Sequence, residues 1–185
     1  MNTSEYYSKI LDELSRSSAS IRDEEVEILL ESILGSKKVF VAGAGRSGLM
    51  ARAFAMRLMH MGIESYVVGE TITRNFEQED LLIIGSGSGE TASLVSMAQK
   101  AKKIGGTVAA VTIFPASTIG NLAQLKITLP GTPKEQSDSG HPTVQPMGAL
   151  FEQTLLLFFD AVILRLMEQK GLNSANMFGR HANLE

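Results

Sequence analysis

Two short segments rich in glycine, serine and threonine hold most of the polar groups that could bind a ligand. They are Gly43-Ala44-Gly45-Arg46-Ser47-Gly48 and Gly85-Ser86-Gly87-Ser88-Gly89-Glu90-Thr91, each between an apolar run and a helical pattern. Glycine permits a tight turn and the close approach of a ligand, and the free N–H groups at a helix start attract an anion. Because hydroxyls and amides together can satisfy a phosphate without a buried cation, the two segments predict a phosphate-binding site.

The first segment leaves two other interpretations open. Its letters match Gly-x-Gly-x-x-Gly, the dinucleotide fingerprint, and Glu70 stands close to the place of the acid that holds the ribose. A tight turn without a ligand is the third possibility. In the second segment, Ser88 and Thr91 could be ordinary helix N-caps, although a cap explains one hydroxyl and not the whole string.

Glu152 is the strongest candidate for a proton-transferring base. It stands among the apolar residues Ala149, Leu150, Phe151 and Leu155, near the start of a long apolar segment. Partial burial strengthens a carboxylate as a base. An exposed glutamate favoured by the positive end of a helix dipole explains the position equally well, so the residues alone leave both interpretations open.

The chain contains three histidines and no cysteine. His181 lies four residues from the end, where histidines are usually solvated, although imidazole can exchange protons near neutral pH. His141 lies in the proline-rich segment 130–146 and could contact a substrate, whereas packing explains His60 best. The histidines lack metal-ligand spacing, and we expect neither a metal nor a cofactor.

The elements that must position these residues alternate along the chain. Apolar runs predict strands at 39–42, 65–68, 81–84, 107–112 and 125–129, and helical patterns predict helices at 23–34, 47–61, 91–104, 117–122 and 147–169, after a first helix around Ile10. This alternation is typical of an α/β three-layer sandwich with a five-stranded parallel sheet, and we predict the flavodoxin-like order 2-1-3-4-5. Both glycine-rich segments then reach the crevice where the winding reverses.

Composition and charge exclude several classes of protein. The 185 residues carry a net charge of −3 without the basic stripe of a nucleic-acid binder. The polar segment 1–10 is unlike a secretory signal, and the apolar stretch 155–167 is too short and too charged to span a membrane. We therefore expect a cytoplasmic protein without nucleic-acid or membrane partners. Residues 1–185 are expected to form one domain, with a helical extension at about 1–35 and a C-terminal helix and tail at about 147–185.

Both segments, Phe151-Glu152-Gln153 and the tail 180–185 resemble the sugar isomerase (SIS) domain family, and within it the 6-phospho-3-hexuloisomerases. The resemblance covers nearly the whole chain. It implies a homo-oligomer, with a tetramer expected, that interconverts D-arabino-3-hexulose 6-phosphate and D-fructose 6-phosphate through an enediol. That step follows formaldehyde capture by ribulose 5-phosphate in the ribulose monophosphate route, which links it to a hexulose-6-phosphate synthase.

The resemblance also implies residue roles. Glu152 would be the catalytic carboxylate, and His181 would help complete the site in its own or a neighbouring subunit. The phosphate would bind to the hydroxyls of Ser86, Ser88 and Thr91 and to the backbone of Gly87, and the sugar or its phosphate would face Arg46 and Ser47.

Three other functions stay open at this point. A different SIS isomerase would act on pentose or heptose phosphates. A non-catalytic phosphosugar sensor would bind such ligands without turnover, although no DNA-binding segment is apparent. A nucleotide-binding oxidoreductase would bind a dinucleotide cofactor instead.

Overall fold

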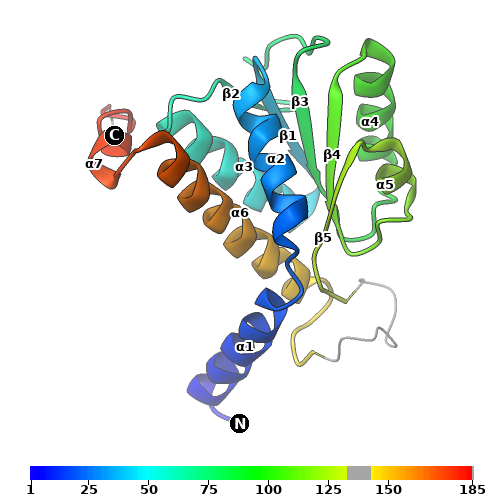
Figure 1. The fold of residues 1–185 in the computed structure, drawn as a ribbon. Coiled ribbons are helices and arrows are strands. Elements are labelled where there is room, and N and C mark those ends of the chain that lie inside the picture. Colours follow the sequence, from blue (N-terminus) through cyan, green and yellow to red (C-terminus); the bar gives the residue numbers. More distant parts are fainter. Residues whose placement is uncertain (133–142, 185) are drawn as a thin grey trace.

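A computed structural model describes residues 1–132 and 143–184 of the chain (Figure 1). The elements follow one another as α1 (Thr3–Ser18), α2 (Asp23–Gly35), β1 (Val39–Gly43), α3 (Gly45–His60), β2 (Ser65–Val67), β3 (Leu81–Gly85), α4 (Ala92–Ile104), β4 (Thr107–Thr112), α5 (Thr118–Leu122), β5 (Leu125–Thr128), α6 (Ala149–Lys170) and α7 (Ser174–Phe178). Within the described residues, most predicted boundaries differ from these by one or two residues.

The strands form one parallel sheet in the order β2-β1-β3-β4-β5. Strands β1 and β3 lie side by side, with Val39 opposite Leu81 at one end and Gly43 opposite Gly85 at the other. Since the chain winds outward in opposite directions from this pair, the topological switch point lies between β1 and β3. The predicted fold class and strand order are confirmed.

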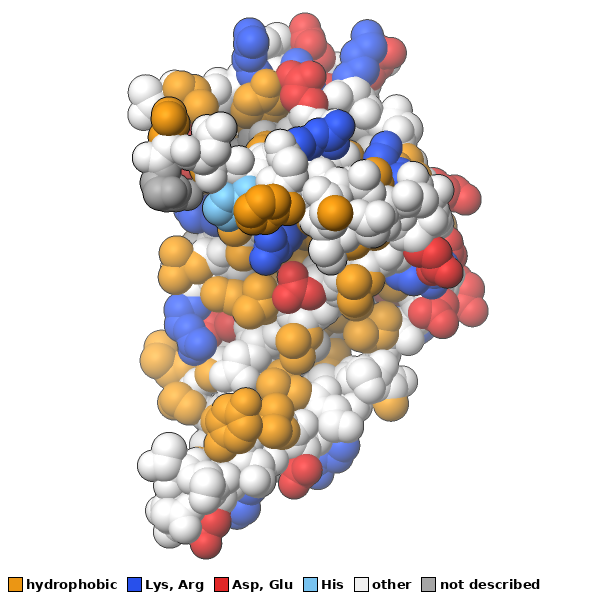
Figure 2. All heavy atoms as spheres, turned by 90° about the vertical axis from the view of Figure 1, so that its left-hand side faces the viewer, with side chains coloured by type: hydrophobic (Ala, Val, Ile, Leu, Met, Phe, Trp, Pro, Cys, Tyr) orange, Lys and Arg blue, Asp and Glu red, His pale blue; other side chains and the backbone are white. Residues whose placement is uncertain are grey.

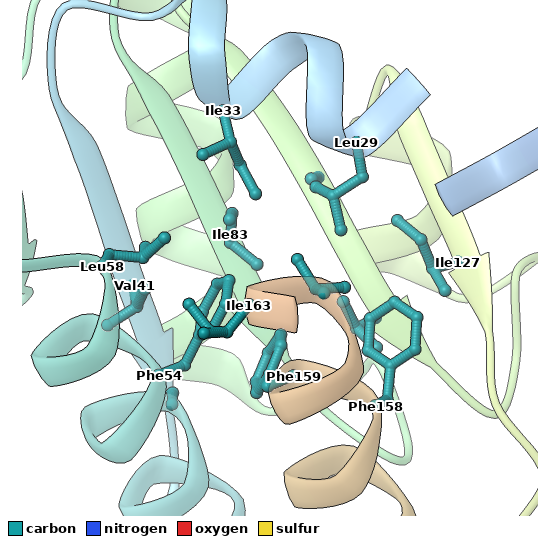
Figure 3. Close-up of a cluster of buried hydrophobic side chains, with 14 of the residues drawn as sticks. Leu29, Ile33, Val41, Phe54, Leu58, Ile83, Ile127, Phe158, Phe159 and Ile163 are labelled. Carbon is teal, nitrogen blue, oxygen red and sulfur yellow. The ribbon is translucent and has the colours of Figure 1, made fainter. Parts of the chain in front are cut away.

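Alternate side chains of the sheet face two separate cores. One core packs under α2, α3 and α6, and the other packs under α4 and α5. Figure 3 shows the first core, where Phe54 of α3 and Phe159 of α6 stack with ring centroids 4.2 Å apart. Burying one such side chain contributes about 1.5–3 kcal/mol, so this packing fixes α6, and the residues at its start, against the sheet.

Glycines end two of the helices. Gly105 after α4 has a φ of 96°, and Gly171 after α6 has a φ of 60°, both in the left-handed region. Helix α6 starts at Ala149 and not at the predicted residue 147, because Met147 itself has a φ of 54° and cannot be helical. None of the helices described is long and apolar enough to cross a membrane.

The C-terminal region contains a short helix where we expected only a polar tail. Asn173 accepts a hydrogen bond from the backbone N–H of Asn176, and the Asn176 side chain accepts one from the backbone N–H of Asn173. This reciprocal capping pair starts α7. Its signal is an Asn-x-x-Asn spacing, which is weaker than the serine–glutamate form that usually marks a helix start.

Candidate active site

A cavity of about 440 Å³ opens at the carboxyl ends of β1 and β3. The residues that line it come from both glycine-rich segments, from the first turn of α4, from the stretches that follow β4 and β5, and from the start of α6. They are Ala44, Gly45, Ser47, Gly85, Ser86, Gly87, Ser88, Glu90, Thr91, Leu94, Ile113, Thr132, Gly148, Phe151 and Glu152. Six of the eight predicted site residues therefore lie around one cavity at the topological switch point.

The first segment needs glycine because two stretches of backbone touch there. A Cβ atom added to Gly48 would lie 2.6 Å from the carbonyl oxygen of Gly43, which is backbone and cannot rotate away. Gly45 has a φ of 56°, which favours glycine at the start of α3. These contacts bring the N-terminus of α3 and the buried Ser47 to the cavity wall.

The second segment is folded around Ser86. Its buried hydroxyl oxygen accepts a hydrogen bond from the N–H of Gly89 at 3.1 Å, and Gly89 has a φ of 65°. Hydrogen bonds from the Thr118 side chain and from its backbone N–H lower the pKa of the Glu90 carboxylate. They tie the segment to α5. The segment is thus a fixed turn, with Ser86 holding its shape.

Thr91 occupies the N-cap position of α4, but its side chain makes no capping hydrogen bond in the described structure. The hydroxyl therefore remains available to a ligand in the cavity. If it binds a phosphate oxygen, the isosteric Thr91→Val variant should raise KM about tenfold or more and leave kcat nearly unchanged. Steady-state kinetics would test this, and a wild-type KM would remove Thr91 from the phosphate site.

Glu152 is buried, with 4% of its surface exposed, at the first turn of α6. One of its carboxylate oxygens lies 2.8 Å from a guanidinium nitrogen of Arg46, whose side chain is half-exposed. The interpretation of Glu152 as an exposed helix-start glutamate is therefore wrong. Arg46 does not line the cavity directly but reaches its edge through this ion pair, which orients the carboxylate.

His181 does not line the first cavity. It lines a second cavity of about 410 Å³ between α3, α6 and α7, together with Arg57 and His60. Its ring stacks on His60 with centroids 5.3 Å apart, and its Nδ1 donates to the carbonyl oxygen of Ala182 at 2.8 Å. Within the described residues of one chain, His181 and Glu152 therefore belong to different cavities.

His60 is buried in this second cavity, as its packing interpretation predicted. Burial lowers its pKa below the ordinary 6.5, and the positive charges of Arg57 and His181 lower it further. Since the unfolded chain then binds the proton more tightly, the free energy of unfolding should fall as pH drops below 6.5. Urea titrations would measure the free energy of unfolding of wild type and His60→Gln at several pH values. The difference between the two proteins should change as pH drops below 6.5, and a difference that is the same at every pH would contradict the assignment.

The Glu70 carboxylate forms an ion pair of 2.5 Å with Arg52 and is absent from the residues lining the first cavity, which weakens the dinucleotide interpretation. His141 lies outside the described residues. No group of three His, Asp or Glu side chains in residues 1–132 and 143–184 could hold a metal ion.

Sequence reasoning missed Ile113 and Thr132, which also line the cavity. Both follow strands, Ile113 directly after β4 and Thr132 a few residues after β5. Their only signal was this position, since the carboxyl ends of parallel strands meet at one edge of the sheet.

Comparisons with known proteins identify the family of the chain. A model of the SIS domain matches residues 32–159. The chain is 60% identical, over the full length of both proteins, to the 3-hexulose-6-phosphate isomerase of Bacillus subtilis. It is 40% identical to the 3-hexulose-6-phosphate isomerase of Mycobacterium gastri, over 96% of this chain and 89% of that protein.

A solved structure from Methanococcus jannaschii, from which a 3-hexulose-6-phosphate isomerase function was inferred, superposes with a TM-score of 0.83 at 36% identity. The match covers 98% of this chain and 99% of that one. The family match and the full-length relatives agree with the resemblance seen in the two glycine-rich segments. The chain therefore belongs to the SIS domain family.

Proposed function

We propose that the chain interconverts D-arabino-3-hexulose 6-phosphate and D-fructose 6-phosphate. The observation that carries the proposal is a buried carboxylate, Glu152, in the wall of a cavity that the serine-rich turn 85–91 also lines. The names of the relatives at 60% and 40% identity support the same reaction. The reaction needs a phosphate anchor and one base, and the cavity has candidates for both.

The phosphate would bind at the turn 85–91. Gly87, Ser88 and Thr91 line this part of the cavity, and the phosphate would accept hydrogen bonds from their hydroxyls and from backbone N–H groups at the start of α4. The Ser88 oxygen also accepts the N–H of Glu90 at 3.2 Å, which leaves its own O–H free to donate. Ser86 contributes by holding the turn, since its oxygen already accepts the N–H of Gly89. Ser47, on the first segment, would contact the sugar. The anchored phosphate would leave the sugar carbons extended toward Glu152.

Glu152 would then remove the proton from C2 of the hexulose. The electron pair of that C–H bond forms the C2=C3 double bond, and the C3 carbonyl oxygen takes a proton to give an enediol. Return of the proton to C3, with loss of the O2–H proton, leaves a carbonyl at C2. A single carboxylate on one face can serve both carbon positions, and the ion pair with Arg46 keeps that carboxylate oriented.

His181 would move the proton between O2 and O3. Since its Nδ1 donates to the carbonyl of Ala182, the neutral ring carries its free electron pair on Nε2, which can accept a proton. His181 does not share a cavity with Glu152 in one chain, so we propose that it acts in the site of a neighbouring subunit.

Assembly into a homo-oligomer, with a tetramer expected, is part of this proposal. Figure 2 shows hydrophobic side chains gathered on the face that carries α1 and α6. Tyr7 on α1 and Leu157 and Leu164 on α6 are each at least half exposed. A second copy would cover them. We also propose a cytoplasmic location and a pathway link to a hexulose-6-phosphate synthase that makes the substrate.

A substrate panel tests the proposed function. Purified protein would be offered the 3-hexulose 6-phosphate, a pentose phosphate and a heptose phosphate in separate assays with a chelator present. We expect kcat/KM to be at least about 100-fold higher for the hexulose. A preference for another sugar phosphate would identify a different SIS isomerase, and binding of all three without turnover would identify a sensor.

A further inference from the structure

A second buried glutamate lies outside both cavities described above. Glu13, near the end of α1, is 7% exposed. Its carboxylate accepts three hydrogen bonds from the segment before α6. The donors are the Thr143 hydroxyl at 2.6 Å, the backbone N–H of Val144 at 2.8 Å and the side-chain amide of Gln145 at 2.9 Å. One carboxylate therefore holds three consecutive residues that lie about 130 positions away in the sequence.

Residues 143–145, which Glu13 anchors, lead along the chain to Glu152 at the start of α6. Met147 turns the chain with a φ of 54°, and Gly148 both lines the first cavity and stands at the N-cap of α6. The carbonyl oxygen of Gly148 accepts the N–H of Glu152 at 3.0 Å. The path from Glu13 to the first turn of α6 is thus a short chain of backbone and hydrogen bonds.

The hydrogen bonds to Glu13 are strongest when its carboxylate is charged. Burial would raise the pKa of Glu13, but the hydrogen bonds from Thr143, Gln145 and Val144 and the charge of Arg16 outweigh burial, and the pKa lies below 4.5. Each donor is thereby paired with an anion, which gives stronger hydrogen bonds than a neutral acceptor. In a Glu13→Gln variant, the side-chain NH₂ group is itself a donor and cannot accept a hydrogen bond, so at least one of the three donors would lose its acceptor.

We propose that Glu13 is a positioning residue for Glu152. By fixing segment 143–148, it sets where α6 begins and therefore where the carboxylate of Glu152 stands in the cavity. The inference rests on the proposed function, since it needs Glu152 to be the base. It gives α1, which extends away from the sheet in Figure 1, a role in catalysis without contact to the substrate.

The test compares three variants with wild type on the 3-hexulose 6-phosphate. Glu13→Gln and Thr143→Val each remove part of the anchor, and Asp12→Asn makes the same carboxylate-to-amide change at an exposed position of α1. We expect kcat to fall roughly tenfold in both anchor variants, since small displacements of a reacting group are costly. KM should stay within about twofold, because the turn 85–91 is unchanged. Asp12→Asn should match wild type in both constants.

The double variant Glu13→Gln/Thr143→Val should have the same kcat as the Glu13→Gln variant, because both substitutions act on the same contact between Glu13 and Thr143. The assays would run well below the unfolding temperature of each variant, so that all chains stay folded. A loss of stability alone would then not lower kcat. Wild-type kcat in a folded Glu13→Gln protein overturns the inference, and so does wild-type kcat for Thr143→Val if Glu13→Gln fails to fold. Absence of turnover by wild type would instead refute the proposed function.

Discussion

Glu152→Gln is expected to lower kcat by about 10²- to 10⁴-fold, the range typical for loss of a positioned general base. An amide cannot accept the C2 proton, whereas it has nearly the same shape as the carboxylate. The turn 85–91 is untouched, so sugar phosphate should still bind. The kinetic loss should therefore appear in kcat and not in the dissociation constant measured by titration with fructose 6-phosphate.

Glu168→Gln is the matched control for this variant. Glu168 lies on the same helix as Glu152, with 79% of its side chain exposed, and it lies in neither cavity described here. Its substitution should leave kcat and the unfolding temperature unchanged. Turnover by Glu152→Gln at the wild-type rate would show that another group removes the proton, and the proposed mechanism would fall.

His181→Ala should lower kcat by about 100-fold, because proton transfer between O2 and O3 would then depend on water. The variant leaves the proposed phosphate contacts at the turn 85–91 unchanged, so the affinity for fructose 6-phosphate should change little. Steady-state kinetics at several pH values would measure the loss. Wild-type kinetics in a folded His181→Ala protein would exclude the histidine from the reaction.

Mixing the two inactive variants distinguishes action within one chain from action between subunits. If each site takes Glu152 from one chain and His181 from another, random re-assembly of equal amounts of Glu152→Gln and His181→Ala chains restores about a quarter of the sites. Activity should then rise to about a quarter of the wild-type value after co-refolding. Activity that stays at the level of the separate variants would place both residues in one subunit's site.

Much of the fold follows from local sequence signals. The strand Leu81–Gly85 is a continuous apolar run that ends in glycine, and Gly105 and Gly171 end their helices in the left-handed region. The strand order then places the turns after β1 and β3 beside each other, which predicted the position of the cavity. These features depend on neighbours in sequence or on rules of chain topology.

The rest depends on contacts between distant residues that leave no local pattern. Nothing around Glu13 indicates a carboxylate buried against Thr143, and nothing around His60 indicates that its ring would stack on His181. The burial of Glu152 could not be decided from its neighbours, because exposed and buried glutamates both occur at the start of an apolar helix. Each of these required the packing of α1, α6 and α7 in three dimensions.

Isotope exchange tests the central claim most directly, since the claim is that Glu152 carries a proton between C2 and C3. Wild-type protein would be held with fructose 6-phosphate in D₂O for many turnovers, and the sugar would be examined by NMR. The carboxyl group can exchange this proton with solvent during the lifetime of the enediol, so we predict deuterium at C3 of fructose 6-phosphate. Incorporation should be at least about 100-fold slower when Glu152→Gln replaces wild type. Interconversion of the two sugar phosphates without any deuterium at C3 would show that the migrating hydrogen never becomes exchangeable with solvent, and it would contradict the account.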